Sequence, residues 1–201
     1  MTTAARTSRL LGAALIVVAL VANVIGHVQQ GDFAFWDTLG YFSQQSNILA
    51  VVLLLIAARS TGKPRPLWLE YARASVATYL VIVTVVFWTL LGGFEAGDPY
   101  RWSTLTMHGI SCAILLADWL LEGPRQAQSI RRAWVVLPYA LVWITVALVR
   151  GATDGWIPYP FMDPKDGYAP VAIVVGGIVV VGLVIGAVLF RLTRWRVVTP
   201  V

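Results

Sequence analysis

The sequence contains few charged residues and only one cysteine. Charged residues make up 12% of the 201 positions and apolar residues 58%, whereas about a quarter of the residues in an average soluble domain are charged. This composition excludes a water-soluble globule. The single cysteine, Cys112, excludes an intrachain disulfide and a zinc ribbon. Both lysines, Lys63 and Lys165, lie outside the long apolar runs, which excludes a retinal-type Schiff base.

Six long runs of the sequence contain no charged residue, and each is at or near the ~17 to 25 residues that a membrane helix needs. The runs are Leu10–Gly31, Thr38–Ala58, Ala74–Phe94, Trp102–Ala117, Ala133–Val149 and Gly167–Phe190. We therefore predict an all-α integral membrane protein with a single bundle of six transmembrane helices. The expected helices lie near residues 8–28, 40–58, 72–92, 103–121, 131–150 and 169–190. Because the loops are too short for a separate domain, residues 1–201 should form one domain.

The charges divide between the two ends of this predicted bundle. Twelve of the fifteen cations fall at one end: Arg6, Arg9, Arg59, Lys63, Arg65, Arg73, Arg125, Arg131, Arg132, Arg191, Arg194 and Arg196. Seven of the ten acids fall at the other end: Asp32, Asp37, Glu95, Asp98, Asp154, Asp163 and Asp166. The positive-inside rule then predicts a multi-pass protein of the cell membrane with both termini in the cytoplasm. Topology explains the basic loops, so we expect no nucleic-acid partner.

Two features of the chain concern prolines. Pro138 falls within the fifth predicted helix and should bend it, whereas Pro170 falls in the first turn of the sixth, where it costs little. The segment 155–170 combines prolines with aromatic residues. It predicts a rigid outer loop that covers the mouth of the bundle.

Polar residues cluster near the outer end of the second predicted helix. Ser43, Ser46 and Asn47 are spaced i, i+3 and i+4, so they share one helix face. Two interpretations stay open. Such side chains commonly form hydrogen bonds between membrane helices, and they also mark reactive or ligand sites, since buried polar groups are costly in a membrane.

The fourth predicted helix carries His108, which shares a helical face with Thr104, Ser111 and Cys112. At 1.5 Å per residue, Ser43 and His108 should lie roughly 5 and 8 Å inside the outer ends of their helices. Matched depth would allow a nucleophile and a general base to meet. The alternative is a histidine whose ring is merely satisfied by a backbone carbonyl. Further along, Asp118 and Trp119 should face away from His108 and have a structural role.

Two metal-based alternatives involve the histidines. His27 and His108 both lie toward the outer end, so a haem with two histidine ligands stays open. Zinc catalysis is disfavoured, because it needs about three ligands in one pocket and the chain has two histidines and one cysteine.

Three segments together resemble the bacterial branch of the androgen-induced-gene family of six-helix membrane proteins. They are Tyr41–Asn47, His108 with Asp118-Trp119 ten residues on, and Trp156–Asp163, whose Tyr-Pro-Phe-x-Asp pattern is the most specific. The resemblance covers the whole chain. Animal members are intramembrane hydrolases of fatty-acid esters of hydroxy fatty acids, with a threonine nucleophile and a histidine. The resemblance implies these roles for Ser43 and His108, with serine in place of threonine.

The sequence therefore leads us to expect an intramembrane hydrolase of long-chain fatty-acid esters, with Ser43 as nucleophile and His108 as base. Asn47 should donate its side-chain amide to the oxyanion, and Ser46 should support the same helix face. Membrane lipids are the expected substrates or ligands, and no cofactor is expected. Two alternatives stay open: a lipid-binding or regulatory membrane protein without turnover, and a haem-binding electron carrier.

Overall fold

The computed structural model describes residues 2–94, 100–121 and 127–194, and these residues form helices and no strand. Six helical segments are long and apolar enough to cross a membrane, which confirms the all-helical prediction and its six long helices. Four of them contain the helices α1 (Thr2–Gln30), α3 (Phe42–Arg59), α4 (Leu67–Thr89) and α8 (Tyr168–Leu192). Their ends differ from the predicted ones by several residues, most of all at the start of α1.

The other two long segments are not uniform α-helices. The fourth consists of α5 (Arg101–Leu105), a π-helical turn (Thr106–Ile110) and α6 (Ser111–Leu121). The fifth begins with a 3-10 helix (Ile130–Val136) and continues as α7 (Leu137–Thr153).

Pro138 lies within the fifth helical segment, next to the junction of the 3-10 helix with α7, and a bend there stays a prediction. Pro138 lies in the first turn of α7, where the missing amide hydrogen has no carbonyl partner within the helix to lose. Pro170 lies in the first turn of α8, as predicted.

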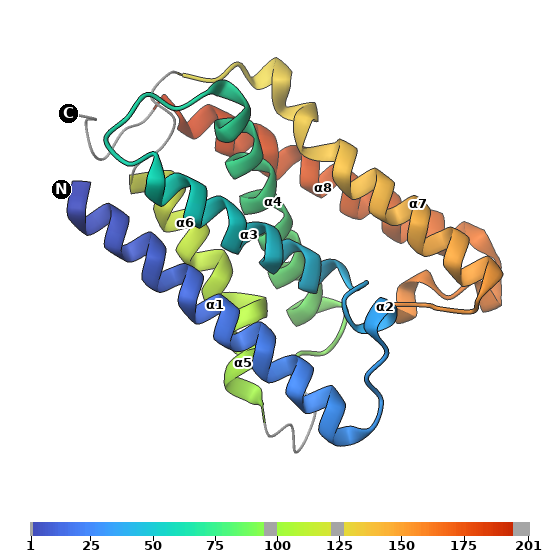
Figure 1. Ribbon diagram of the computed structural model, residues 1–201. Helices are drawn as coiled ribbons and strands as arrows, with labels where there is room; N and C mark the ends of the chain where they lie inside the picture. Colours follow the sequence, from blue (N-terminus) through green and yellow to red (C-terminus); the bar gives the residue numbers. More distant parts are fainter. Residues whose placement is uncertain (1, 95–99, 122–126, 195–201) are drawn as a thin grey trace.

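Helix α4 occupies the centre of the bundle and packs against α3, α6 and α8 (Figure 1). On one side α1 packs along α3 through small residues such as Ala13, Ala50 and Ala57, which are at most 2% exposed. On the other side α8 approaches α4 closely, because a Cβ atom on Gly182 would lie 3.1 Å from Cδ1 of Ile82. Helix α7 runs beside α8, and the start of α1 and the end of α8 lie at the same end of the bundle (Figure 1).

We call that end the basic end, because it carries Arg6, Arg59, Lys63, Arg131, Arg132, Arg191 and Arg194. The opposite end, the acidic end, carries Asp32, Asp37, Asp154, Asp163 and Asp166. Of the charges used in the prediction of orientation, Glu95, Asp98, Arg125 and Arg196 lie outside the described residues.

A buried ionic cluster, composed of Arg9, Arg65, Glu70, Arg73 and Asp118, joins α1, α4 and α6 at the basic end. Asp118 accepts from Arg9 Nε at 2.6 Å and from Arg73 Nη2 at 2.7 Å. Glu70 pairs with Arg73 at 2.8 Å and with Arg65 at 2.6 Å. The three arginine side chains are at most 2% exposed. Asp118 therefore has a structural role, as predicted.

Trp119 adds a further connection at this end. Its indole nitrogen donates to the carbonyl oxygen of Leu189 in α8 at 3.2 Å. The guanidinium group of Arg73 lies 5.6 Å from its ring centroid. Trp119 thus ties α6 to α8 beside the ionic cluster.

The acidic end is closed by α2 (Phe35–Thr38) and by the loop between α7 and α8. This loop contains two short 3-10 turns, Pro160–Met162 and Pro164–Asp166. It enters α8 through Gly167, whose φ of +88° favours glycine.

Candidate functional site

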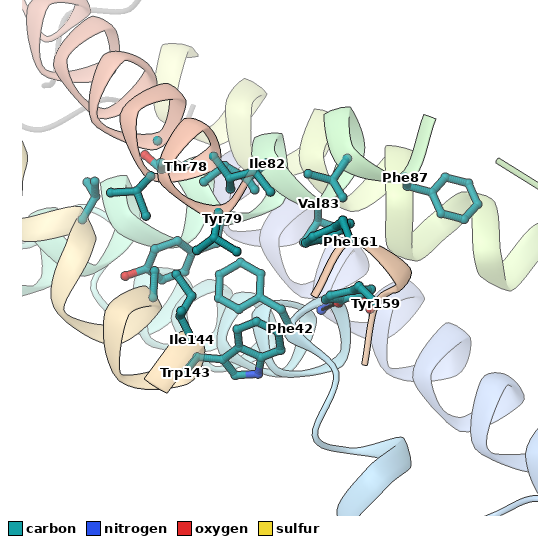
Figure 2. Close-up of a pocket in the computed structure, with 18 of the residues that line it drawn as sticks. Phe42, Thr78, Tyr79, Ile82, Val83, Phe87, Trp143, Ile144, Tyr159 and Phe161 are labelled. Atoms are coloured by element: carbon teal, nitrogen blue, oxygen red, sulfur yellow. Dashed lines mark hydrogen bonds between the residues drawn. The ribbon is translucent and has the colours of Figure 1, made fainter. Parts of the chain in front are cut away.

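A largely apolar cavity lies between α3 and α4 on one side and α7 and α8 on the other (Figure 2). Its volume is about 80 Å³, which is smaller than the roughly 300 to 1,000 Å³ of a typical small-molecule site. Lining residues that carry a hydroxyl or imidazole group are Ser43, Thr78, Tyr79, His108 and Tyr159. The rest are aliphatic or aromatic, among them Phe42, Ile82, Val83, Val86, Phe87, Ala140, Trp143, Ile144, Phe161, Val175 and Val179.

The cavity is elongated along the helices. On α4 its lining extends from Thr78 to Phe87, which corresponds to roughly 14 Å at 1.5 Å per residue. Half of the hydrocarbon core of a bilayer measures about 15 Å. The lining of the cavity therefore extends along α4 over about the thickness of half the hydrocarbon core.

Ser43 lies in the first turn of α3, which begins at Phe42. Its side chain is 8% exposed and lines the cavity. The amide groups of a first helical turn have no carbonyl partner within the helix and carry a partial positive charge. The Ser43 hydroxyl thus occupies a position where developing negative charge is stabilised.

His108 lies in the π-helical turn and also lines the cavity. Its Nδ1 is 2.9 Å from the carbonyl oxygen of Thr104. Since a carbonyl oxygen only accepts, Nδ1 carries the hydrogen, and Nε2 is the ring nitrogen that can take up a proton. The ring stacks on Phe87 at 4.1 Å between centroids. Both interpretations of His108 thus hold: a carbonyl satisfies one nitrogen, while the ring lines a cavity.

The π-helical turn changes which residues share a face. It accommodates more residues per turn than an α-helix, so the 3.6-residue periodicity does not continue through it. Of the four residues expected on one face, His108 lines the cavity, whereas Thr104, Ser111 and Cys112 do not. Ser111 instead donates to the carbonyl oxygen of Met107 at 3.2 Å. The structure places one of the four predicted residues at the cavity, and their shared helix face stays a prediction.

Ser43 and His108 line the same cavity, and they belong to two different helical segments. The hydrogen bonds of the described residues include none between the Ser43 hydroxyl and the His108 ring. Catalytic hydrogen bonds are often long without substrate and tighten in the complex. The arrangement can therefore provide a nucleophile and a base at one cavity, with no hydrogen bond between their side chains among the described residues.

Asn47 and Ser46 lie away from the cavity. The Nδ2 atom of Asn47 donates to the carbonyl oxygens of Ser43 at 2.8 Å and Met107 at 3.0 Å. These two bonds use both of its hydrogens, so Asn47 has none to donate to an oxyanion, contrary to expectation. Ser46 is fully buried and does not line the cavity. Both residues fit the interpretation of polar groups packed between helices.

Tyr159 is a residue whose position at the site the sequence analysis missed. Its hydroxyl accepts a hydrogen bond from the backbone N–H of Ser43 at 3.4 Å. Burial raises the pKa of the Tyr159 phenol to about 12, although hydrogen bonds with Ser43 act in the opposite direction. The signal was present in the rigid proline- and aromatic-rich loop, but nothing in the sequence says which ring turns inward.

The loop that carries Tyr159 covers the cavity, as predicted. Tyr159 and Phe161 line the cavity, and their rings stack at 5.3 Å between centroids. Met162 is 4% exposed. The predicted packing of this loop over the bundle is therefore confirmed.

His27 lies near the end of α1, in a partly exposed pair with Asp32 at 3.0 Å. It does not line the cavity that contains His108. Within the described part of the chain the two histidines do not share this pocket, so their placement gives no support to the haem alternative.

Comparison of the chain with protein-family models, curated proteins and solved structures finds no match.

Proposed function

We propose that this chain is an intramembrane hydrolase of long-chain fatty-acid esters, with Ser43 as nucleophile and His108 as general base. One observation carries the proposal: Ser43 and His108, 65 positions apart in the sequence, line the same apolar cavity. The resemblance of the sequence to the androgen-induced-gene family implies the same two residues.

The proposal includes the membrane and its orientation. Six helices have the length and apolarity of membrane spans. Exposed cations gather at the basic end, which by the positive-inside rule faces the cytoplasm. Ser43 and Tyr159 lie at the acidic end, so the reaction would occur in the outer half of the membrane.

The substrate class follows from the lining of the cavity. Aliphatic and aromatic side chains from α4, α7 and α8 would surround an acyl chain, and the polar groups near the acidic end would hold the ester. A lipid could enter sideways from the bilayer without crossing water.

The reaction begins with attack of Ser43 Oγ on the ester carbonyl carbon, while His108 Nε2 takes the Ser43 proton. The carbonyl π electrons move onto oxygen and form an oxyanion. When the carbonyl re-forms, the ester C–O bond breaks, and His108 delivers its proton to the leaving alkoxide. A water molecule then attacks the acyl-serine with His108 as base, and this step releases the fatty acid and restores the Ser43 hydroxyl.

A second candidate function is lipid binding without turnover. It is favoured by the absence of a direct hydrogen bond between the Ser43 hydroxyl and the His108 ring among the described contacts. Such a protein would hold a single-chain lipid in the same cavity and leave the ester intact.

The test uses the purified full-length chain in lipid nanodiscs with a long-chain fluorogenic ester. Ser43→Ala and His108→Ala should each remove nearly all hydrolysis, and the double variant should be little worse, because the two residues act as a unit. Ser43→Thr should keep measurable activity. Ser46→Ala is the matched control, since Ser46 lies on the same helix but not at the cavity, and its activity should be unchanged.

Covalent labelling identifies the nucleophile independently. A fluorophosphonate probe should modify the wild-type chain at Ser43, located by mass spectrometry, and should not modify Ser43→Ala. A folded Ser43→Ala protein with full esterase activity would refute the nucleophile. A wild-type protein that binds the ester tightly and never hydrolyses it would favour the second candidate.

A further inference from the structure

The loop between α7 and α8 brings a phenol to the nucleophile. We infer that Tyr159 donates a hydrogen bond to the oxyanion that forms when Ser43 attacks an ester. The inference rests on the proposed hydrolysis and assigns to that site the donor that its chemistry requires.

The Tyr159 hydroxyl lies close to the backbone of the proposed nucleophile. The Tyr159 hydroxyl lies 3.4 Å from the backbone nitrogen of Ser43. In acyl transfer the carbonyl oxygen must come close to the nucleophile's own surroundings, because its carbon bonds to Oγ. A donor beside the amide of the nucleophile is therefore near the place where the oxyanion develops.

Neighbouring aromatic rings hold the Tyr159 side chain in place. The Tyr159 ring lies 5.7 Å from the Tyr41 ring, 5.9 Å from the Trp143 ring and 5.3 Å from the Phe161 ring, between centroids. These contacts hold the phenol from several sides. A donor that is already oriented costs little reorganisation during the reaction, which is the main source of oxyanion stabilisation.

The protonation state of the Tyr159 phenol decides whether it can donate a hydrogen bond. A phenol donates a hydrogen bond only in its neutral form, and burial raises the pKa of Tyr159 to about 12. Tyr159 therefore keeps its proton at neutral and moderately alkaline pH. It donates without transferring the proton, since His108 carries out the proton transfers.

The other side-chain donors near Ser43 either use their hydrogens elsewhere or point away. Both hydrogens of the Asn47 amide are used by backbone carbonyls. The Trp143 indole donates to the carbonyl oxygen of Gly40 at 2.8 Å. The Thr78 hydroxyl donates to the carbonyl oxygen of Ala74 at 2.9 Å. The Tyr79 hydroxyl points away from Tyr159 (Figure 2).

This assignment gives the loop a second task. The same segment covers the cavity with Phe161 and brings the Tyr159 hydroxyl to Ser43. The position of the donor is therefore set by the loop that covers the cavity.

The test is Tyr159→Phe, which keeps the ring and removes only the hydroxyl. Loss of one oxyanion donor should lower kcat about 100- to 1,000-fold, while KM changes less than about threefold, because the donor acts in the transition state. The matched control is Tyr139→Phe, which removes a phenol hydroxyl that donates to Gln45 Oε1 and belongs to a residue outside the cavity lining. It should retain kcat.

A trifluoromethyl ketone with a long alkyl chain provides a second measurement. It forms a tetrahedral adduct with the serine and carries an oxyanion, so Tyr159→Phe should weaken its binding about as much as it lowers kcat. Binding of the corresponding fatty alcohol, which has no oxyanion, should be unchanged. A residue that only supports the fold would affect both ligands alike.

Fluorotyrosine incorporated at position 159 retains the shape of the side chain and has a more acidic phenol. The alkaline limit of kcat should then move to lower pH. Wild-type kcat in Tyr159→Phe, beside an inactive Ser43→Ala, overturns this inference alone. Absence of hydrolysis by the wild-type chain overturns the proposed function and this inference with it.

Discussion

Replacement of Asp118 by asparagine tests the buried ionic cluster directly. Asp118 accepts from Arg9 at 2.6 Å and from Arg73 at 2.7 Å, and its side chain is 11% exposed. The substitution keeps the shape and removes the charge. The described members of the cluster are three guanidinium groups and two carboxylates. Asp118→Asn leaves the three guanidinium groups with one carboxylate.

The magnitude follows from burial. Removal of one partner from a buried ion pair typically costs about 3 to 5 kcal/mol, because the remaining charge stays out of water without compensation. Asp118→Asn should therefore lower the free energy of unfolding by roughly that amount. Asp37→Asn is the matched control. Asp37 accepts from Arg150 at a similar 2.7 Å but is 44% exposed, and exposed pairs contribute about 0 to 1 kcal/mol.

The assay is reversible unfolding in mixed detergent micelles, followed by tryptophan fluorescence. Trp119 lies next to the cluster and should report its loss. Addition of Arg9→Met to Asp118→Asn should recover part of the stability, because it removes a buried cation whose partner is lost. Equal losses in Asp118→Asn and Asp37→Asn would refute the argument from burial.

Three further predictions concern the cavity, the orientation and the loop. Ala140→Trp places a large side chain in the lining of the cavity, so the ratio of kcat/KM for a long-chain ester to that for a short-chain ester should fall at least about tenfold; an unchanged ratio would mean that the acyl chain lies elsewhere. With Cys112 first replaced by alanine, a cysteine at position 163 should react with an impermeant maleimide in intact cells and one at position 63 should not; the reverse pattern would invert the orientation. Burial raises the folded-state pKa of Tyr159 from 10.0 to about 12, so the contribution of Tyr159 to stability is complete below pH 10 and is lost as the pH rises through 12. The unfolding free energy of the wild type should therefore fall more steeply over that interval than that of Tyr159→Phe. Parallel curves for the two proteins would contradict the burial of this phenol.

Much of the architecture could be predicted from the sequence, because helix length and apolarity are local properties. The charge-free runs identified all six long helices, and the proline- and aromatic-rich segment 155–170 predicted a covering loop. The start of α7 at Leu137, next to Pro138, could not be predicted from the charge-free run. Helix ends depend on which neighbours satisfy the terminal amides, which a run of apolar residues does not reveal.

The sequence predicted those parts of the site that depend only on how far a residue lies from the end of its helix. Ser43 and His108 were paired from their distances to the helix ends, and the structure places both at one cavity. The role of Asn47 failed because spacing along a helix does not tell which neighbouring carbonyls take the amide hydrogens. Periodicity did not tell which residue of the group around His108 lines the cavity, because a π-helical turn changes the rotation per residue.

The sequence by itself determined the all-helical class, the six long apolar helices found among the described residues, the division of the charges between a basic and an acidic end, and the two candidate reactive residues. Only the tertiary structure decided that Asp118 joins Arg9 to Arg73, that Asn47 binds backbone carbonyls, and that Tyr159 turns inward to Ser43. The reason is physical. Hydrophobicity and charge act along the chain and can be read from it, whereas the partner of a buried polar group is chosen by whichever segment packs against it.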